Sequence, residues 1–354
     1  MSRRIGFRVS AGGQDVTGQL EDLGVSITIT DAIGTESDRA EIEFDDLGGQ
    51  IESVETGVEL LIWLGYVPGL DFMGRYIVDE VNYEGWPQKV IVLARAADQR
   101  DSLKERRVEA YEDRTLGDIF QEVAGRNGLQ AAVSGQIASF HYAYIAQQEE
   151  SDEEFASRLA GKHGAIATIK NGRLIVVPKG SGENPEGQSM GTFHVRRPGN
   201  LVSYSVVWKD KPAHEKVEAS WFDREEAELE TVEEDASDHG PVYRIREPFP
   251  TEDEAKEAAR SKAIDIRRGE ATATFEVEGD TEARAEMLLQ CSGVRSKVDG
   301  LWSIERVEHR VDGTFTTMIT AKPPEQSSNG SGGGSSGGSG GSDRDRLNWT
   351  PPDW

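Results

Sequence analysis

The chain has 354 residues, which is too long for one ordinary hydrophobic core, so we expect two or three domains. It carries 39 Lys and Arg against 64 Asp and Glu, a formal net charge of −25, which argues against binding of the nucleic-acid backbone as a main activity. A single cysteine, Cys291, excludes an internal disulfide and a cysteine-ligated metal centre.

The chain begins MSRRIGFRVSAGG, which has two arginines but no apolar segment of the kind found in a secretory signal peptide. Its longest uninterrupted apolar runs, such as Leu60–Leu64, are far short of the roughly 18 residues that span a bilayer. We therefore expect neither membrane insertion nor classical secretion.

Residues 1–98 have the pattern of a small all-β unit. Alternating or β-branched runs, bounded by Gly, Pro, Asp or Asn, predict strands over 25–30, 40–44, 58–66, 75–83 and 89–96.

Residues 99–191 change to a mixed pattern. Thr115 caps a predicted helix, and Asn171-Gly172 lies between two alternating apolar runs, which is a strong hairpin signal. This part is predicted to be a compact α/β domain.

The stretch 147–164, QQEESDEEFASRLAGKHG, is dense in acids and raises the question of a catalytic cluster. Ser151 and Glu154 have the spacing of a capping box, and the acids of the first turn suit the positive end of the helix dipole. Gly164 is the expected stop. We therefore interpret the stretch as a capped helix, with His163 in its last turn rather than in an acid/base role.

Residues 192–325 return to strands, interrupted by one predicted helix from Thr251 to about Arg267, where Thr251 and Glu254 form a second capping-box pattern. The acidic segment 222–239 is interpreted as a solvated loop or extended hairpin. A metal site is the alternative, although no ligand spacing defines one.

An internal repeat links the two β regions. GRYIVDEVNYE (74–84) aligns without a gap on GLWSIERVEHR (300–310), and VELLIWLG (58–65) aligns on AEMLLQCS (285–292), which pairs Leu64 with Cys291. Cys291 is thus expected at a core strand position. The repeat predicts two copies of one β-barrel, so that three chains would present six similar units and a trimer would imitate a six-fold ring.

The C-terminal end differs from the rest. Residues 326–342 are almost wholly Gly and Ser, a composition typical of a flexible linker, and lead to WTPPDW. Trp349 and Trp354 offer apolar anchors, and Pro351 and Pro352 favour an extended backbone. These four residues are the candidate partner-binding site; a disordered end or an artificial linker is the alternative.

No catalytic motif stands out. The sequence has no H-E-x-x-H, G-x-S-x-G or G-x-x-x-x-G-K-[ST] and no Cys/His ligand spacing, so we expect no enzyme, cofactor or metal. His309 alternates with apolar neighbours and is interpreted as a packed residue that corresponds to Tyr83 in the repeat. The second hypothesis is a tail-associated hydrolase of cell-wall glycan that uses acids of 147–164 or 222–239, and the third is a carbohydrate- or receptor-binding module.

Three stretches resemble a known family, the phage late control gene D proteins, which are tail baseplate hubs related to the hub portion of VgrG. They are YAYIAQQEESDEEFASRLAGKHGAIATIKNGRLIVVP (142–178), TEDEAKEAARSKAIDIRRGEATATFEVEGD (251–280) and DGLWSIERVEHRVDGTFTTMIT (299–320). The resemblance covers roughly residues 1–323. It does not extend to the Gly/Ser tail, and the chain lacks the fused spike of VgrG.

The resemblance implies a mainly β fold with two tail-tube-like β-barrels separated by a small α/β domain. The expected boundaries are a first barrel at 1–98, an α/β insert at 99–191, a second barrel with one helix at 192–325 and a flexible tail at 326–354. It also implies a homotrimer in the virion tail baseplate, assembled in the host cytoplasm. The expected partners are the tail tube protein, a separate spike protein, other baseplate proteins and the tape measure protein, around a channel that DNA passes without specific binding.

Overall fold

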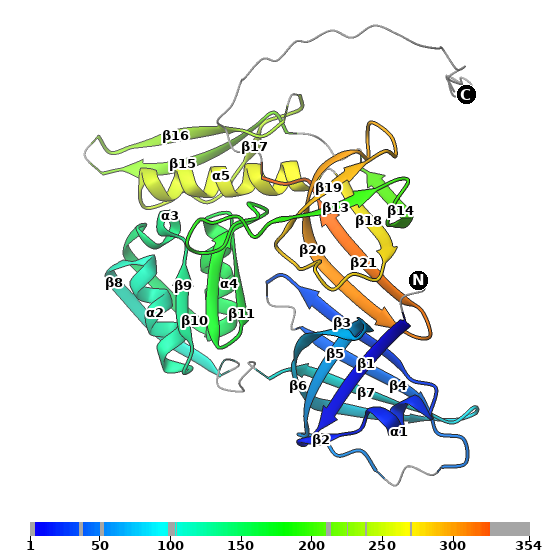
Figure 1. Cartoon of the computed structure of the whole chain (residues 1–354). Coiled ribbons are helices and arrows are strands. Elements are labelled where there is room, and N and C mark those ends of the chain that lie inside the picture. Colours follow the sequence, from blue (N-terminus) through cyan, green and yellow to red (C-terminus); the bar gives the residue numbers. More distant parts are fainter. Residues whose placement is uncertain are drawn as a thin grey trace, which may run out of the picture.

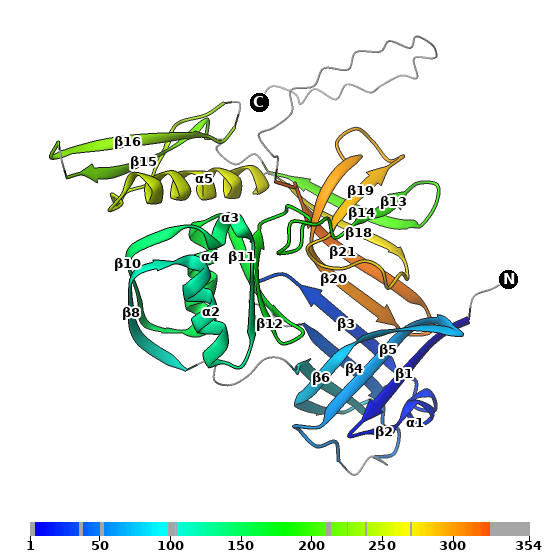
Figure 2. The same ribbon diagram turned by 60° about the vertical axis from the view of Figure 1, so that its left-hand side comes forward.

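The computed structural model describes residues 4–325 except 35–37, 50–52, 98–102, 104, 210–213, 225, 238 and 270. The chain is mainly β, and most of its helices lie together on one side of the strands, whereas the short α1 (Thr17–Glu21) lies apart from them (Figures 1 and 2). None of the helices within the described ranges is long and apolar enough to cross a lipid bilayer.

We call the six principal strands of the N-terminal part the first β-unit. They are β1 (Arg4–Ala11), β3 (Ser26–Ala32), β4 (Arg39–Asp45), β5 (Glu59–Val67), β6 (Gly69–Glu84) and β7 (Lys89–Ala96), with the short β2 (Gln14–Asp15) and α1 (Thr17–Glu21) beside them. Burial alternates along β4, where Ala40, Ile42 and Phe44 face the core. The strands predicted from 25 to 96 are confirmed, whereas β1 was missed.

The middle region follows, and lies to one side of the β-units in Figure 1. It contains β8 (Arg106–Thr115), α2 (Leu116–Arg126), β9 (Gln130–Val133), α3 (Gly135–Ala138), β10 (His141–Ser151), α4 (Asp152–Lys162), β11 (Ala165–Lys170) and β12 (Arg173–Pro178). The predicted hairpin is confirmed, since Asn171 and Gly172, both at positive φ, join β11 to β12. Strands β8 and β10 were not predicted.

The second β-unit is formed by six strands of the C-terminal part. They are β13 (Thr192–Arg196), β14 (Leu201–Trp208), β18 (Ala271–Glu278), β19 (Leu288–Ser292), β20 (Gly300–Val311) and β21 (Phe315–Lys322). Between β14 and β18 the chain leaves the unit to form β15 (Lys216–Asp223), β16 (Glu228–Asp235), β17 (Tyr243–Arg244) and α5 (Glu252–Arg268), which packs on that small sheet. The predicted helix is therefore present.

The predicted second capping box is only half formed. The Thr251 hydroxyl accepts a hydrogen bond from the backbone N–H of Glu254, as a cap requires. The Glu254 carboxylate, however, contacts the Thr251 hydroxyl instead of returning to the backbone N–H of Thr251. Thr251 has an extended backbone conformation and is the N-cap residue of α5, so the helix still begins directly after it.

The two β-units have the same strand order. In the first unit the order is β3-β4-β7-β6-β5-β1, and in the second it is β14-β18-β21-β20 followed by β19 and β13. They join through antiparallel pairing of β3 with β20, which makes one 13-stranded sheet. They differ at one edge, because β1 is antiparallel to β5 whereas β13 is parallel to β19.

The correspondence extends to an irregularity in the ladder. A β-bulge lies between Val78 and Glu80 in β6, and an equivalent bulge lies between Ile304 and Arg306 in β20. Ile304 lies 226 residues after Val78, which is the offset of the first predicted match. A bulge repeated at the same position is a specific backbone feature and is not explained by shared strand composition.

The second predicted match was wrong by two residues. Gly74 pairs with Ile62 and the equivalent Gly300 pairs with Cys291, so Cys291 corresponds to Ile62 rather than to Leu64. A shift of two keeps every side chain on its own face, so the polarity pattern could not reveal it. Cys291 is fully buried in the core of the second β-unit, as the sequence indicated.

Candidate functional site

Helix α4 is capped as predicted. The Ser151 hydroxyl accepts from the backbone N–H of Glu154 at 3.2 Å, and the Glu154 carboxylate accepts from the backbone N–H of Ser151 at 2.8 Å. His163 follows the last turn with a buried side chain, whose Nε2 lies 2.9 Å from the Tyr142 hydroxyl. Gly164 then turns the chain at φ +62°. His163 is therefore a packed terminal residue.

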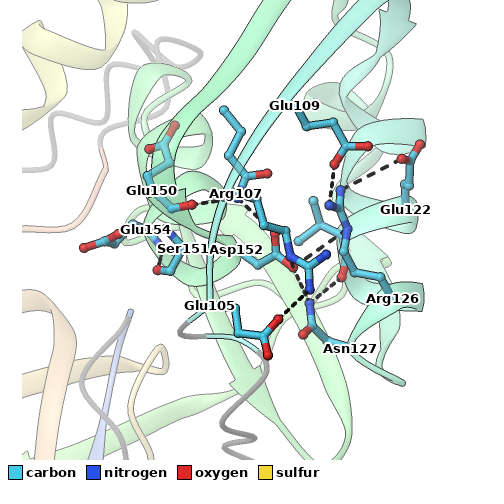
Figure 3. Close-up of polar contacts among 12 residues, drawn as sticks. Glu105, Arg107, Glu109, Glu122, Arg126, Asn127, Glu150, Ser151, Asp152 and Glu154 are labelled. Atoms are coloured by element: carbon cyan, nitrogen blue, oxygen red, sulfur yellow. Dashed lines mark hydrogen bonds and ion pairs between the residues drawn. The ribbon is translucent and has the colours of Figure 1, made fainter.

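The acidic stretch 147–164 contains a fully buried carboxylate, that of Asp152, whose exposed fraction is 0%. Its two oxygens accept hydrogen bonds from Asn127 Nδ2 at 2.7 Å and Gln147 Nε2 at 3.0 Å. The Nε atoms of Arg107 and Arg126 each lie 3.8 Å from it, as Figure 3 shows. Amide donors and two guanidinium groups thus offset the cost of burying the charge.

Other residues of the stretch 147–164 hold the end of β10 against α4. Glu150 binds Arg158 of α4, with Nε to Oε2 at 2.9 Å, and Arg158 Nη2 donates to the Ala146 carbonyl at 2.8 Å. This contact ties the end of β10 to the helix that follows it. The Q-x-x-E-S-D run and its arginine are therefore used for local structure.

Glu154 is a poor general acid. The pKa of Glu154 is lowered, first by the hydrogen bond from the Ser151 backbone and then by that from its hydroxyl. A glycan hydrolase needs one carboxyl whose pKa is raised, so the shift at Glu154 has the wrong sign for that chemistry.

The acidic segment 222–239 contains most of a hairpin. Strands β15 and β16 pair antiparallel from Lys216 opposite Asp235 to Asp223 opposite Glu228, so the prediction of an extended hairpin is confirmed. Most acids of β16 are solvent-exposed. Among the residues that the structure describes, no group of three His, Cys, Asp or Glu side chains is placed to hold a metal ion.

His309 is packed in the core, as predicted. Nε2 lies 3.3 Å from the Ala283 carbonyl, and since a carbonyl only accepts, Nε2 carries the proton. Nδ1 then accepts from the Thr317 hydroxyl at 3.0 Å. Burial, followed by the charge of Arg284, lowers the pKa of His309 to about 4, so the imidazole is neutral near pH 7.

A half-buried charge cluster joins the three parts of the chain. We call Asp31, Asp38, Lys170 and Glu286 the junction cluster. Lys170 on β11 bonds to Asp31 on β3 and lies 3.8 Å from Asp38, while Asp31 accepts from the backbone N–H of Ala285 at 2.9 Å. These side chains border a cleft of about 880 Å³ between the middle region and the β-units.

The junction cluster has more acids than bases, and this shifts its titration. Burial raises the pKa of Asp38 to about 6, although Lys170 acts in the opposite direction. Burial likewise raises the pKa of Glu286, again opposed by Lys170. Sequence reasoning missed this cluster, because its members come from segments up to about 250 residues apart and carry no local motif.

Two strand edges are open. Within the described ranges, no strand pairs with β14 on the side away from β18, or with Asp79–Glu84 of β6 on the side away from β7. These edges carry large exposed side chains. The exposed fractions are 54% for Tyr83, 52% for Val207 and 48% for Trp208. Open strand edges of this kind are places where another chain can add strands.

The candidate partner-binding residues Trp349, Pro351, Pro352 and Trp354 lie outside the described residues.

Comparison with known proteins identifies the family of the chain. Residues 23–314 match the sequence profile of the phage tail baseplate hub (GPD) family. The chain belongs to this family. The probable baseplate hub protein of Escherichia phage 186 is 27% identical, over 88% of this chain and 91% of the relative. The resemblance in the three stretches is thus confirmed.

Solved structures share the fold of this baseplate hub. The 43 kDa tail protein of prophage MuSo2 from Shewanella oneidensis aligns with a TM-score of 0.68 at 14% identity, over 90% of this chain and 98% of that one. The E. coli c3393 protein, a component of the type VI secretion system, aligns with a TM-score of 0.55 at 10% identity, over 92% of this chain and 75% of that one. The hub fold is therefore found in phage tails and in a type VI secretion component.

Proposed function

We propose that this hub is a homotrimer in which six β-units form a ring, and that the ring connects the six-fold tail tube to a three-fold spike. Each chain contributes both β-units, each a tube-like barrel. The carrying observation is that both units have the same strand order and the same bulge within a single chain. Three copies of a duplicated unit close a ring of six by a heterologous contact.

The proposed domains follow the predicted boundaries. The first barrel spans residues 1–98, the α/β insert 99–191, the second barrel 192–325 and the tail 326–354. The positions of β1–β7 and β8–β12 support the first two boundaries, and within 192–325 the strands β15–β17 and α5 form a separate small sheet and helix beside the second β-unit. The proposed neighbours in the virion tail are the tube protein, a separate spike protein, other baseplate proteins and the tape measure protein, with assembly in the host cytoplasm.

The ring would surround a passage for DNA. The chain has a net charge of −25, and an acidic wall repels phosphates so that DNA slides without being held. We assign no binding site for nucleic acid to the hub.

The hub would act without chemistry of its own. The acids of the stretch 147–164 are engaged in capping α4 and in the buried contacts of Asp152, and Glu154 has a lowered pKa. A turbidity assay on peptidoglycan tests this directly, because clearing by the purified hub would support the hydrolase instead.

The decisive experiment is the mass of the purified hub by light scattering, alone and with its tube and spike proteins. We expect about three times the chain mass of 38.8 kDa, and one trimer for each spike. A chain that remains monomeric in both conditions would contradict the ring.

A further inference from the structure

The open edges of the two β-units point to a specific joint between copies. We propose that the open edge of β14 in one chain pairs antiparallel with Asp79–Glu84 of β6 in the next copy, in the register that β3 and β20 adopt inside each chain. This inference rests on the proposed trimer and specifies its interface.

The first step is to identify which strand of the second β-unit corresponds to β3. Ile29 of β3 pairs with Ala40 of β4, and Val206 of β14 pairs with Ala273 of β18. Strands β4 and β18 occupy the same place in their units, next to β7 and β21. Because β14 corresponds to β3, the open edge of β14 corresponds to the edge of β3 that is covered by β20.

The second step is to identify the counterpart of β20. The shared bulge aligns Glu80 with Arg306, so Tyr83 aligns with His309. His309 pairs with Ile29 across the internal joint. The same joint between copies therefore places Tyr83 opposite Val206.

The full register follows from these two correspondences. Reading outward from Tyr83 opposite Val206, the expected pairs are Glu80 with Lys209, Val81 with Trp208, Asn82 with Val207 and Glu84 with Ser205. Glu80 and Lys209 are both exposed, and opposite charges directly across an antiparallel ladder attract.

Burial supports the proposal. Val307 and His309, which β3 covers, are fully buried, whereas their counterparts Val81 and Tyr83 are half-buried and 54% exposed. This greater exposure of Val81 and Tyr83 is expected if β6 lacks a neighbouring strand in the single chain, whereas β20 already has β3 as its neighbour.

The described residues Val54 and Gly57 before β5 contact β6 as their counterparts in the second β-unit contact β20. Gly57 N–H donates to the Val78 carbonyl, as Glu286 N–H donates to the Ile304 carbonyl, and Val54 N–H donates to the Tyr83 hydroxyl. In the second β-unit the corresponding contact joins His309 to Ala283. In the second β-unit these contacts coexist with the pairing of β20 and β3, so the equivalent contacts of Val54 and Gly57 do not exclude the proposed pairing of β6.

The test is disulfide trapping between copies of the full chain. The variants are Asn82→Cys with Val207→Cys, and Tyr83→Cys with Val206→Cys. Directly opposed residues have Cα atoms about 4.5 to 5.5 Å apart, a span that a disulfide bridges. Cys291 does not compete, because it is fully buried and burial raises the pKa of its thiol to about 11.

The matched control is Asn82→Cys with Ser205→Cys, which lies two residues out of register on the same face of the ladder. Mild oxidation should convert an in-register variant to linked dimers and covalent trimers on a non-reducing gel, reversed by dithiothreitol. The control should remain a single-chain band. Two in-register variants are used, so that misfolding of one leaves the other to decide.

The outcomes separate this interface from the proposed function. If light scattering gives a trimer but neither in-register variant cross-links, or the control cross-links equally well, then the register is wrong and the trimeric hub stands. If the unmodified chain is monomeric alone and with its tube and spike proteins, then both the trimer and this interface are rejected.

Discussion

Asp152 lies in an acidic stretch that resembles a catalytic cluster, but its contacts are structural. Its carboxylate is fully buried and accepts from two side-chain amides between two arginines (Figure 3). Removing the carboxylate would leave the buried amides of Asn127 and Gln147 without their acceptor. The acid therefore contributes to the stability of the middle region.

We expect Asp152→Ala to destabilise the middle region by about 3 kcal/mol, since the buried amides of Asn127 and Gln147 lose their acceptor. Hydrogen exchange of the α2 and α4 amides measures this locally, which avoids assuming that the whole chain unfolds in one step. Glu112→Ala, which removes an exposed acid from β8, is the control and should change exchange little. Equal protection in both variants would contradict the structural role.

His309 should make the second β-unit sensitive to acid. An unfolded histidine takes up a proton near pH 6.5, but the buried side chain does so only near pH 4. Acidification below 6.5 therefore favours the unfolded state, and the loss reaches about 3 kcal/mol near pH 4. Stability against urea between pH 7 and 4 should fall more steeply for the wild type than for His309→Gln. Arg284 and Asp31 remain in both proteins, so parallel pH profiles would refute the assignment.

At the scale of single residues, the sequence revealed the local chemistry but not the long-range partners. The Ser151 and Glu154 spacing was enough to predict the capping box, because both bonds close within one turn. The Asp152 partners Asn127 and Arg107 come from α2 and β8, and β8 had no recognisable strand pattern. The junction cluster was hidden for the same reason, because it depends on tertiary packing.

Two glycines at the start of equivalent strand segments share an unusual backbone. Gly74 has φ +147° and Gly300 has φ +133°, conformations that favour glycine. A Cβ at Gly74 would lie 2.9 Å from the Tyr76 hydroxyl, whereas a Cβ at Gly300 would meet nothing within 4 Å.

These glycines provide a matched pair of variants. Gly300→Ala should cost about 1 kcal/mol or more through backbone strain alone. Gly74→Ala should cost a further 1–3 kcal/mol or so, because the new methyl group overlaps the Tyr76 ring. Melting temperatures of the two variants test the order, and a larger loss for Gly300→Ala would contradict the steric conflict between the new methyl group and Tyr76.

At the scale of elements, the predicted repeat covered β6 with β20 and, two residues out of register, β5 with β19. The correspondence of β3 with β14 escaped the sequence, because β15–β17 and α5 are inserted between β14 and β18 and change the spacing. The remaining similarity is alternation of polarity, which any strand shares. Pairing partners, which define the correspondence, are visible only in the folded sheet.

For the whole molecule, the family and the mainly β class were accessible from sequence. Three stretches with specific spacing carried the resemblance, and the family match covers residues 23–314. The union of both β-units into one sheet was not accessible, since it depends on pairing between residues about 280 positions apart.

The C-terminal tail gives a prediction for the assembled hub. Deletion of residues 343–354 should reduce co-purification with baseplate partners, because Trp349 and Trp354 would no longer be available as apolar anchors. The control shortens the Gly/Ser segment by a few residues but keeps WTPPDW. Unchanged co-purification of the deletion variant would reject a docking role.

The pairing of β3 with β20 also has a consequence for biosynthesis. Ile29 is translated about 280 residues before His309, which lies opposite it, so at about 5–20 residues per second the ribosome needs tens of seconds to supply the partner strand. During that interval the nascent chain displays an unsatisfied β3 ladder to the cytoplasm. Fragments that terminate before β20 should therefore aggregate in an expression culture. Binding of chaperones to the nascent chain should end once the hairpin β20–β21 has been synthesised.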